Sequence, residues 1–328
     1  MKQNPVYKRE TRVNSRSLRL PLILTVFNGI LCAVALMNMY SVVSQVKATA
    51  TIQYSSFMEM YEFVATIEFI LLTFIVPAVT ASSISGERER QTLELMLTTQ
   101  MTPAQIVNGK LMSALSTLLL LIISSFPAIM MVFVFGGITP IDVVALLLCY
   151  TAVAMVFVYG GITWTDAVSL ILCYITVAFF AGSLGICFSS AFKRSTLSTV
   201  LTYGVLVSIV GGTYFVNRFV LGLSAGRINS YAITYGIGRA QQQPTSGNFV
   251  YLLLMNPAAT FYAIISGQAG SGSGVDKLCK AFGIVQKGWV MENWVLISIV
   301  LQLAVAACLL ALAIWFVNPI RRRRKKRG

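Results

Sequence analysis

The stretch SSISGERERQTLELMLTTQMTPAQIVNGK (residues 82–110) is a charged island between two long apolar runs. Residues 60–84 and residues 111–135 are each long enough to cross a bilayer, which takes about 20 apolar residues. The sequence therefore predicts a short polar connection between two transmembrane helices, with no water-soluble domain inserted there.

Residues 86–98 of this island are predicted to form an amphipathic helix. Apolar residues recur at three- and four-residue spacing and form one face: Leu93, Met96 and Leu97. Charged residues at helix-supporting spacing form another: Glu87, Arg90 and Glu94. The segment Thr-Pro-Ala-Gln (residues 102–105) is typical of a capping box with proline at the first helical position, so a second helix is predicted to begin there.

Composition independently predicts a membrane protein. Of the 328 residues, 56% are hydrophobic and 11% are charged, and the mean hydropathy is +0.77. Soluble domains carry about 25% charged residues, so no large water-soluble domain is expected. The absence of histidine excludes His-based catalysis, and the six cysteines lack metal-type spacing, so no metal site is predicted. The predicted fold class is an all-α, polytopic integral membrane protein.

Six transmembrane helices are predicted within a single transmembrane domain, residues 20–318. Their expected spans are residues 20–43, 60–84, 104–135, 165–188, 197–220 and 294–317. Residues 1–19 are predicted to form an amphipathic helix on the cytoplasmic membrane surface, because arginines recur at helical spacing: Arg9, Arg12, Arg16 and Arg19. A basic tail, residues 319–328, follows the last span.

The net charge of +14 is concentrated at the proposed cytoplasmic ends of these spans. This positive-inside pattern predicts a multi-pass protein with both termini in the cytoplasm. The basic tail is expected to lie on anionic lipid headgroups. No aromatic–basic interleaving accompanies the charge, so nucleic-acid binding is not expected.

A tandem repeat occupies residues 131–178. Residues 131–154 and residues 155–178 are identical at 16 of 24 aligned positions. Two copies are too few for a solenoid, so a local duplication is predicted. A full extra crossing would place the basic tail outside, against the positive-inside pattern. A re-entrant or surface-lying hairpin is therefore favoured, although the sequence does not establish how the repeat is accommodated.

Residues 221–293 are predicted to lie on the outer side as a re-entrant helical region. The apolar run within it, residues 249–265, is interrupted by Asn256 and Pro257 and is too short to cross the membrane twice. Such backbone is tolerated at membrane depth where protein buries it.

Glu68 lies inside the second predicted span, where an ionised group is costly unless it is paired or hydrated. One hypothesis makes it a pathway or interface residue that faces the centre of a dimer. The alternative places it close enough to the outer headgroups to stay hydrated. Pro77 is predicted to kink the same span.

Three segments of the chain resemble the membrane subunits of type-2 ABC exporters. The most specific is ISGERERQTLELML (residues 84–97), which is similar to the coupling helix of that family. NPVYKRE (residues 4–10) and RVNSRSLRLP (residues 12–21) resemble the amphipathic elbow before its first span. LLLMNPAATFYAIISG (residues 252–267) resembles the Asn-Pro segment before its last span.

The resemblance implies that residues 86–98 are a coupling helix that docks on an ATPase subunit. The residues expected to couple are Gly86, Glu87, Arg88, Glu89, Arg90, Thr92, Leu93 and Glu94. It also implies the permease subunit of an ATP-driven exporter in a prokaryotic inner membrane, paired with a second copy or a paralogue. The chain has no GxxxxGK[ST] loop, so it is expected to be no enzyme and to bind no cofactor. ATP and Mg would be used by a separate soluble ABC ATPase.

Two other functional classes were weighed against this interpretation. An ion-driven secondary transporter or channel predicts inverted repeats and several intramembrane charges, whereas the repeat here is tandem and only Glu68 fits. An integral membrane enzyme would need a cluster of catalytic polar residues, which the sequence does not show. The sequence names no substrate and does not distinguish a homodimer from a heterodimer.

Overall fold

The structure is a computed structural model that describes residues 4–49, 54–98, 101–134, 164–235, 243–268, 274–284 and 288–318. Every regular element within these ranges is a helix, which confirms the predicted all-α class. The elements are α1 (Pro5–Arg16), α2 (Arg19–Thr49), α3 (Tyr54–Thr80), α4 (Ser85–Glu89), α5 (Thr92–Thr98), α6 (Pro103–Val134), α8 (Trp164–Ala191), α9 (Ser195–Val207), the π-helix η1 (Ser208–Gly212), α10 (Thr213–Tyr235), the 3₁₀-helix η3 (Gly247–Met255), α11 (Pro257–Gln268), α12 (Gly274–Ala281), α13 (Trp289–Glu292) and α14 (Trp294–Val317).

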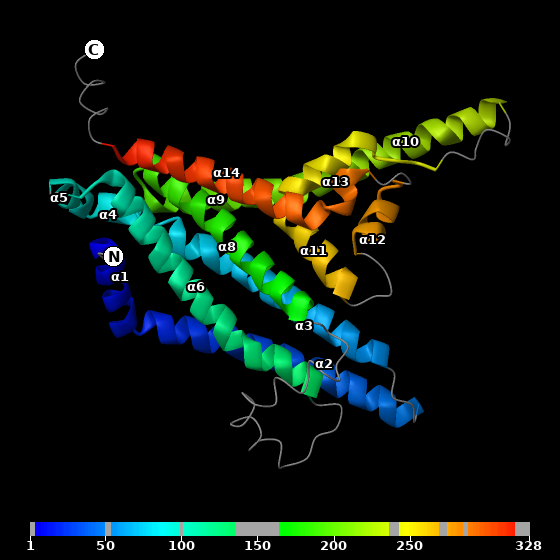
Figure 1. The fold of residues 1–328 in the computed structure, drawn as a ribbon, viewed down its shortest axis with the longest axis horizontal. Coiled ribbons are helices and arrows are strands. Elements are labelled where there is room, and N and C mark those ends of the chain that lie inside the picture. Colours follow the sequence, from blue (N-terminus) through cyan, green and yellow to red (C-terminus); the bar gives the residue numbers. More distant parts are fainter. Residues whose placement is uncertain are drawn as a thin grey trace.

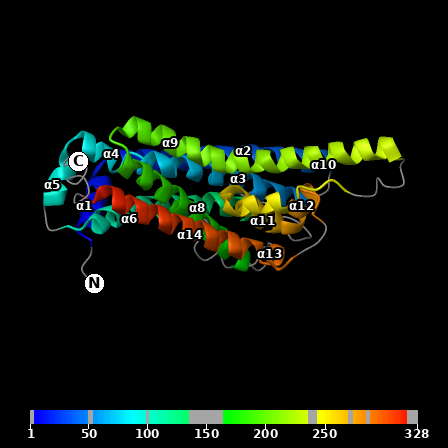
Figure 2. The same cartoon turned by 90° about the horizontal axis from the view of Figure 1, so that it is seen from above.

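The long helices run lengthwise through an elongated bundle (Figure 2). Helices α1, α4 and α5 gather at one end, together with the C-terminal end of α14 (Figure 1). The far half of α10 and helices α11, α12 and α13 lie toward the opposite end (Figure 1). The first helix, α1, and the C-terminal end of the last helix, α14, therefore lie at the same end of the molecule.

Six helical segments of the described residues are long and apolar enough to cross a membrane. They are Leu20–Asn38, Glu62–Glu89, Pro103–Ser125, Val168–Ala191, Ser195–Ser230 and Trp294–Val317. Each of the six predicted spans overlaps one of them, so the polytopic helical architecture is confirmed. The repeat at residues 131–178 lies mostly outside the described residues, and its predicted hairpin stays a prediction.

The fifth helix is much longer than predicted. The sequence placed its end near residue 220 and assigned residues 221–235 to the outer re-entrant region, but α9, η1 and α10 form one continuous helical run to Tyr235. Its apolar segment alone has 36 residues, about 54 Å at 1.5 Å per residue, against a hydrocarbon core of about 30 Å. Figure 2 accordingly shows α10 extending past the other helices.

Helices η3 and α11 form the bent pair that the Asn-Pro interruption predicted. The two helices meet at an angle of 96°, the geometry of a re-entrant loop or a broken span. Asn256 ends η3 and its Oδ1 accepts a hydrogen bond from the backbone N–H of Ala258 at 2.9 Å, while Pro257 begins α11. The break therefore follows from an N-cap and an N-terminal proline placed side by side.

Helix α8 is the centre of the bundle, packed against α3, α6 and α14. Its contact with α3 is closest at Gly185, where an added Cβ would meet Thr80 Oγ1 at 2.1 Å and the backbone nitrogen of Ala81 at 3.2 Å. Glycine at this position allows the end of α3 to lie directly on α8. This contact positions the polar segment that follows α3.

Replacing Gly185 is expected to destabilise the bundle. Gly185→Ala should lower the free energy of unfolding by about 1–3 kcal/mol, because the methyl group overpacks the α3–α8 contact. The matched control is Gly204→Ala in α9, where nothing lies within 4 Å of an added Cβ. That variant should be neutral or stabilising, because alanine is the better helix former. Thermal unfolding in detergent measures both, and a Gly185→Ala protein as stable as the wild type would contradict the close contact.

Candidate functional site

The predicted coupling segment is two short helices rather than one. Helix α4 ends at Glu89 and α5 begins at Thr92, so the continuous helix predicted over residues 86–98 is wrong. The chain turns at Gln91, whose φ of 59° lies in the left-handed region. Thr92 Oγ1 donates to the Glu87 carbonyl at 3.1 Å and closes this turn. Of the residues expected to pair along one helix, Glu87 instead contacts another helix, while Arg90 and Glu94 are exposed.

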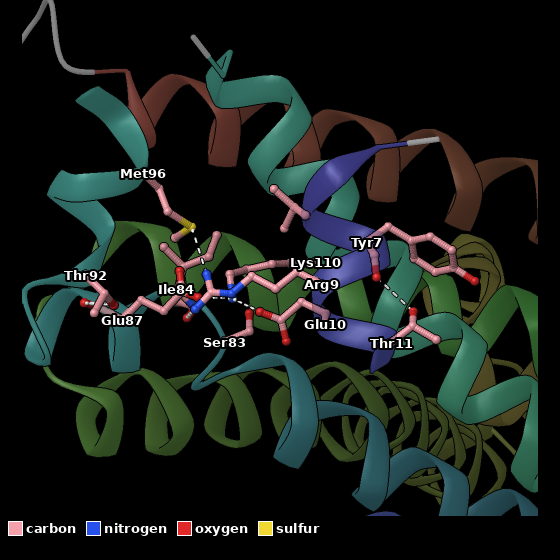
Figure 3. Close-up of polar contacts among 12 residues, drawn as sticks. Tyr7, Arg9, Glu10, Thr11, Ser83, Ile84, Glu87, Thr92, Met96 and Lys110 are labelled. Atoms are coloured by element: carbon pink, nitrogen blue, oxygen red, sulfur yellow. Dashed lines mark hydrogen bonds and ion pairs between the residues drawn. The ribbon is translucent and has the colours of Figure 1, made fainter. Parts of the chain in front are cut away.

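Glu87 faces inward, toward a buried lysine of α6. Lys110 Nζ lies 2.8 Å from Glu87 Oε1 and 3.2 Å from Glu10 Oε1 on α1. The Lys110 side chain is only 4% exposed, against 16% for Glu87 and 26% for Glu10. Figure 3 shows Lys110 between the two carboxylates. One ammonium group therefore joins three helices that are far apart in the sequence.

Arg88 also faces the protein, at the C-terminal end of α8. Its guanidinium donates to the Ser190 carbonyl at 2.8 Å and to the Phe192 carbonyl at 3.1 Å. The last carbonyls of a helix have no intrahelical donor and carry partial negative charge. Arg88 therefore caps α8 and fixes α4 to the turn between α8 and α9.

The same turn is held by two further contacts from the coupling segment. Glu89 accepts from the backbone N–H of Ser195 at 2.9 Å and from its hydroxyl at 2.7 Å, at the first residue of α9. In return, Ser189 Oγ accepts from the backbone N–H groups of Ile84 and Ser85, each at 2.9 Å. Backbone groups without an intrahelical partner occur at the C-terminal end of α8 and at the N-terminal ends of α9 and α4. Each of these ends is thus bound by a side chain of a neighbouring helix.

Apolar side chains hold α5 in place. Leu93 and Met96 are buried, as the predicted apolar face required. They belong to a cluster that also contains Val6 of α1, Ile106 of α6 and Ile186 of α8. Arg9 of α1 lies over this cluster, with its Nη1 3.8 Å from the Met96 sulfur. Helix α5 is therefore anchored to the bundle on one side.

The opposite edge of the coupling segment is exposed. Two pairs of consecutive side chains occupy it: Arg90 and Gln91, and Glu94 and Leu95. Leu95 is 68% exposed, although it is apolar. Of the eight predicted coupling residues, Arg90 and Glu94 have a free face, and Glu89 is exposed but bound to Ser195. Glu87, Arg88 and Leu93 instead fix the segment to the bundle. Thr92 closes the turn inside the segment, and Gly86 is half-buried in α4.

The predicted elbow helix is attached to the start of α6. Asn4 caps α1 by accepting from the Val6 N–H at 3.1 Å, and its Nδ2 donates to the Gln105 carbonyl at 2.7 Å. An added Cβ at Gly109 would lie 2.8 Å from Val6 Cβ, so α1 rests directly on α6. The predicted capping box is present: Thr102 N–H donates to Gln105 Oε1 at 3.0 Å and Gln105 N–H donates to Thr102 Oγ1 at 3.3 Å.

Glu68 lies in neither of its two predicted environments. Its side chain is fully enclosed by helices of its own chain, so it faces neither a dimer centre nor the headgroups. Ser125 of α6 donates to Glu68 Oε1, and the hydroxyl of Tyr174 on α8 lies beside it. Pro77 lies inside α3, three residues after Phe74, whose carbonyl accepts from the Tyr203 hydroxyl at 2.6 Å. Glu68 therefore acts in a contact between helices, and Pro77 lies within the helix as predicted.

Asn256 joins the bent pair to the fifth helix. Its Nδ2 donates to the Val210 carbonyl and to Thr213 Oγ1, both at 2.9 Å. Val210 lies in the π-helix η1, where a widened turn leaves backbone carbonyls without their usual donors. The predicted re-entrant residue Asn256 thus also fixes the local irregularity between α9 and α10, while Pro257 begins α11.

Several residues of this site were missed from the sequence. Lys110 was recognised only as one more basic residue near a span end, and Glu10 as part of the elbow motif. Ser189 and Ser195 gave no signal, because a serine near a helix end is common. No group of three or more metal-ligating side chains occurs in the described ranges.

The family described as ABC-2 family transporter protein matches residues 5–318. No curated protein matches the chain.

Arg88 is expected to control the order of the turn between α8 and α9. Arg88→Gln should weaken this turn by about 2–3 kcal/mol, because two carbonyls lose a charged donor. Arg88→Lys should restore only part of the lost stability, since an ammonium group lacks the planar geometry by which a guanidinium binds two carbonyls at once. Amide exchange over residues 186–198 measures the effect, with exposed Arg90→Gln as the control. Unchanged exchange in Arg88→Gln would show that the cap is dispensable.

Proposed function

The chain belongs to the ABC-2 transporter family, and we propose that it is the permease subunit of an ATP-driven exporter whose ATPase docks on α4 and α5. The observation that carries the proposal is the exposed edge of Arg90, Gln91, Glu94 and Leu95 on a segment whose other side is fixed to the bundle. An exposed leucine between charged side chains is suited to a protein partner with an apolar contact and a polar rim.

The contacts of α4 and α5 suggest how a docked subunit would act on the membrane helices. A push on the exposed edge would move α4 together with the helix ends to which it is hydrogen-bonded. The push is passed to α8 through Arg88, and to α9 through Glu89. Charge-assisted hydrogen bonds are shorter and stronger than neutral ones, so these two links would hold during the movement. Closure of ATPase subunits would therefore shift α4 together with α8 and α9.

We place α1, α4, α5 and both termini in the cytoplasm of a prokaryotic cell, since the basic residues before α2 and after α14 follow the positive-inside pattern. A second copy or a paralogue would complete the transport path, and movement would be outward. ATP and Mg would be bound by the ATPase, while the basic tail would contact anionic lipid.

The docking edge can be tested without disturbing the fold. Glu94→Arg and Leu95→Asp are expected to reduce retention of the ATPase on the purified permease by about tenfold or more, because truncating or reversing a contact typically costs about 2 kcal/mol or more at the few residues that dominate binding. Both side chains are exposed, so helicity and thermal stability should be unchanged. Co-purification and permease-stimulated ATP hydrolysis are the measurements.

The matched control is Glu292→Arg, an equally exposed reversal at the opposite end of the molecule. It should leave ATPase retention at the wild-type level. Full retention in both edge variants would refute docking on α4 and α5. Equal loss in Glu292→Arg would instead show that net charge, rather than this edge, determines binding.

A further inference from the structure

Lys110 has two counter-ions where charge balance requires one. Its Nζ contacts Glu87 at 2.8 Å and Glu10 at 3.2 Å, and its side chain is 4% exposed. Burying an ammonium group is tolerated only if an anion compensates it. Either carboxylate alone satisfies this condition. One of the two is therefore free to leave without stranding a buried cation.

The two carboxylates differ in how firmly their helices are attached to α6, the helix that carries Lys110. Glu10 is on α1, which is fixed to α6 by the Asn4–Gln105 hydrogen bond at 2.7 Å, by the Val6–Gly109 contact and by Tyr7 Oη, 3.0 Å from Ser116 Oγ. Because Lys110 is on α6, and α1 is attached to α6, Glu10 and Lys110 keep their positions relative to each other. Glu87 is on α4, a helix of five residues that Arg88 and Glu89 attach to the turn between α8 and α9. Helix α4 can therefore move with α8 and α9 while Glu10 and Lys110 stay together.

Glu87 is also the less completely satisfied of the two. Its second oxygen, Oε2, is buried and makes no hydrogen bond with the described protein atoms. A buried carboxylate oxygen without a donor is costly, and movement of α4 outward would hydrate it. Glu87 is therefore the carboxylate that leaves when α4 moves, while Glu10 stays on Lys110.

We propose that Glu10 is a reserve counter-ion that lets Glu87 detach from Lys110 when the coupling segment moves. The inference rests on the proposed function, because the ATPase supplies the movement. Glu10 is a positioning residue: it touches neither nucleotide nor cargo, and it acts by keeping Lys110 compensated after Glu87 has left. Without Glu10, detachment of Glu87 would leave an uncompensated buried ammonium group.

The test variant is Glu10→Gln, studied in the full permease–ATPase complex in nanodiscs containing anionic lipid. ATPase retention should be unchanged, since Glu10 faces Lys110 and is not one of the side chains of the exposed edge. The kcat of stimulated ATP hydrolysis should fall about tenfold, with the KM for ATP unchanged, because detachment of Glu87 becomes harder. Amide exchange in α4, measured on the permease alone, should become slower, because Glu87 is now the only counter-ion of Lys110.

Two further variants distinguish this role from a simple structural tie. Glu10→Asp keeps the charge and should restore most of the turnover. Lys8→Gln, an exposed charge change on the same helix, should leave turnover and exchange at wild-type values. A structural tie would instead give faster exchange in both α1 and α4 of Glu10→Gln. That result, or an unchanged kcat, would overturn the proposal.

Failure of the proposal about Glu10 can be distinguished from failure of the proposed function. If the wild-type permease retained no ATPase, the proposed function would fail, and the exchange measurement on the permease alone would still decide about Glu10. Slower α4 exchange in Glu10→Gln would support the reserve counter-ion, and unchanged or faster exchange would reject it.

Discussion

A buried positive charge at the polar end of the bundle determines how the first helix, the coupling segment and α6 are placed. Lys110 is almost completely enclosed, so the chain must bring it a carboxylate. The two that it brings come from residues about a hundred and about twenty positions away. Glu10 fixes α1 to α6, and Glu87 brings α4 to the same lysine. The packing of Val6, Leu93 and Met96 then completes this end.

The neighbouring contacts obey the same constraint, that buried polar groups need partners. Helix α8 ends and α9 begins within a few residues, which leaves carbonyls and N–H groups without intrahelical partners. Arg88 donates to carbonyls at the end of α8, and the next residue, Glu89, accepts from the N–H at the start of α9. The coupling segment is thus joined to the membrane helices by hydrogen bonds to backbone atoms. Such contacts depend on the positions of whole helices rather than on single side chains.

The sequence predicted the helical class, the approximate spans and the apolar face of α5, because these depend on local composition and periodicity. The capping box at Thr102 was also predictable, since its partners are three residues apart. Three features were not. The break at Gln91 arises because Glu87 and Glu89 bind other helices, and the inward face of Arg88 depends on the turn after α8. The enclosure of Glu68 depends on Ser125 and Tyr174, which belong to other helices. Each is a long-range contact that leaves no periodic signal.

The length of the fifth helix has a mechanical consequence. Helices α9 and α10 form an unbroken rod whose first residue, Ser195, is held by Glu89 of the coupling segment. A rod that is longer than the bilayer is thick behaves as a lever arm, in which a small tilt at one end becomes a larger sweep at the other. The contact of Asn256 with Val210 and Thr213, near the middle of the rod, is placed as its fulcrum. Movement of the coupling segment by the proposed partner would therefore produce a larger displacement at the far tip of α10.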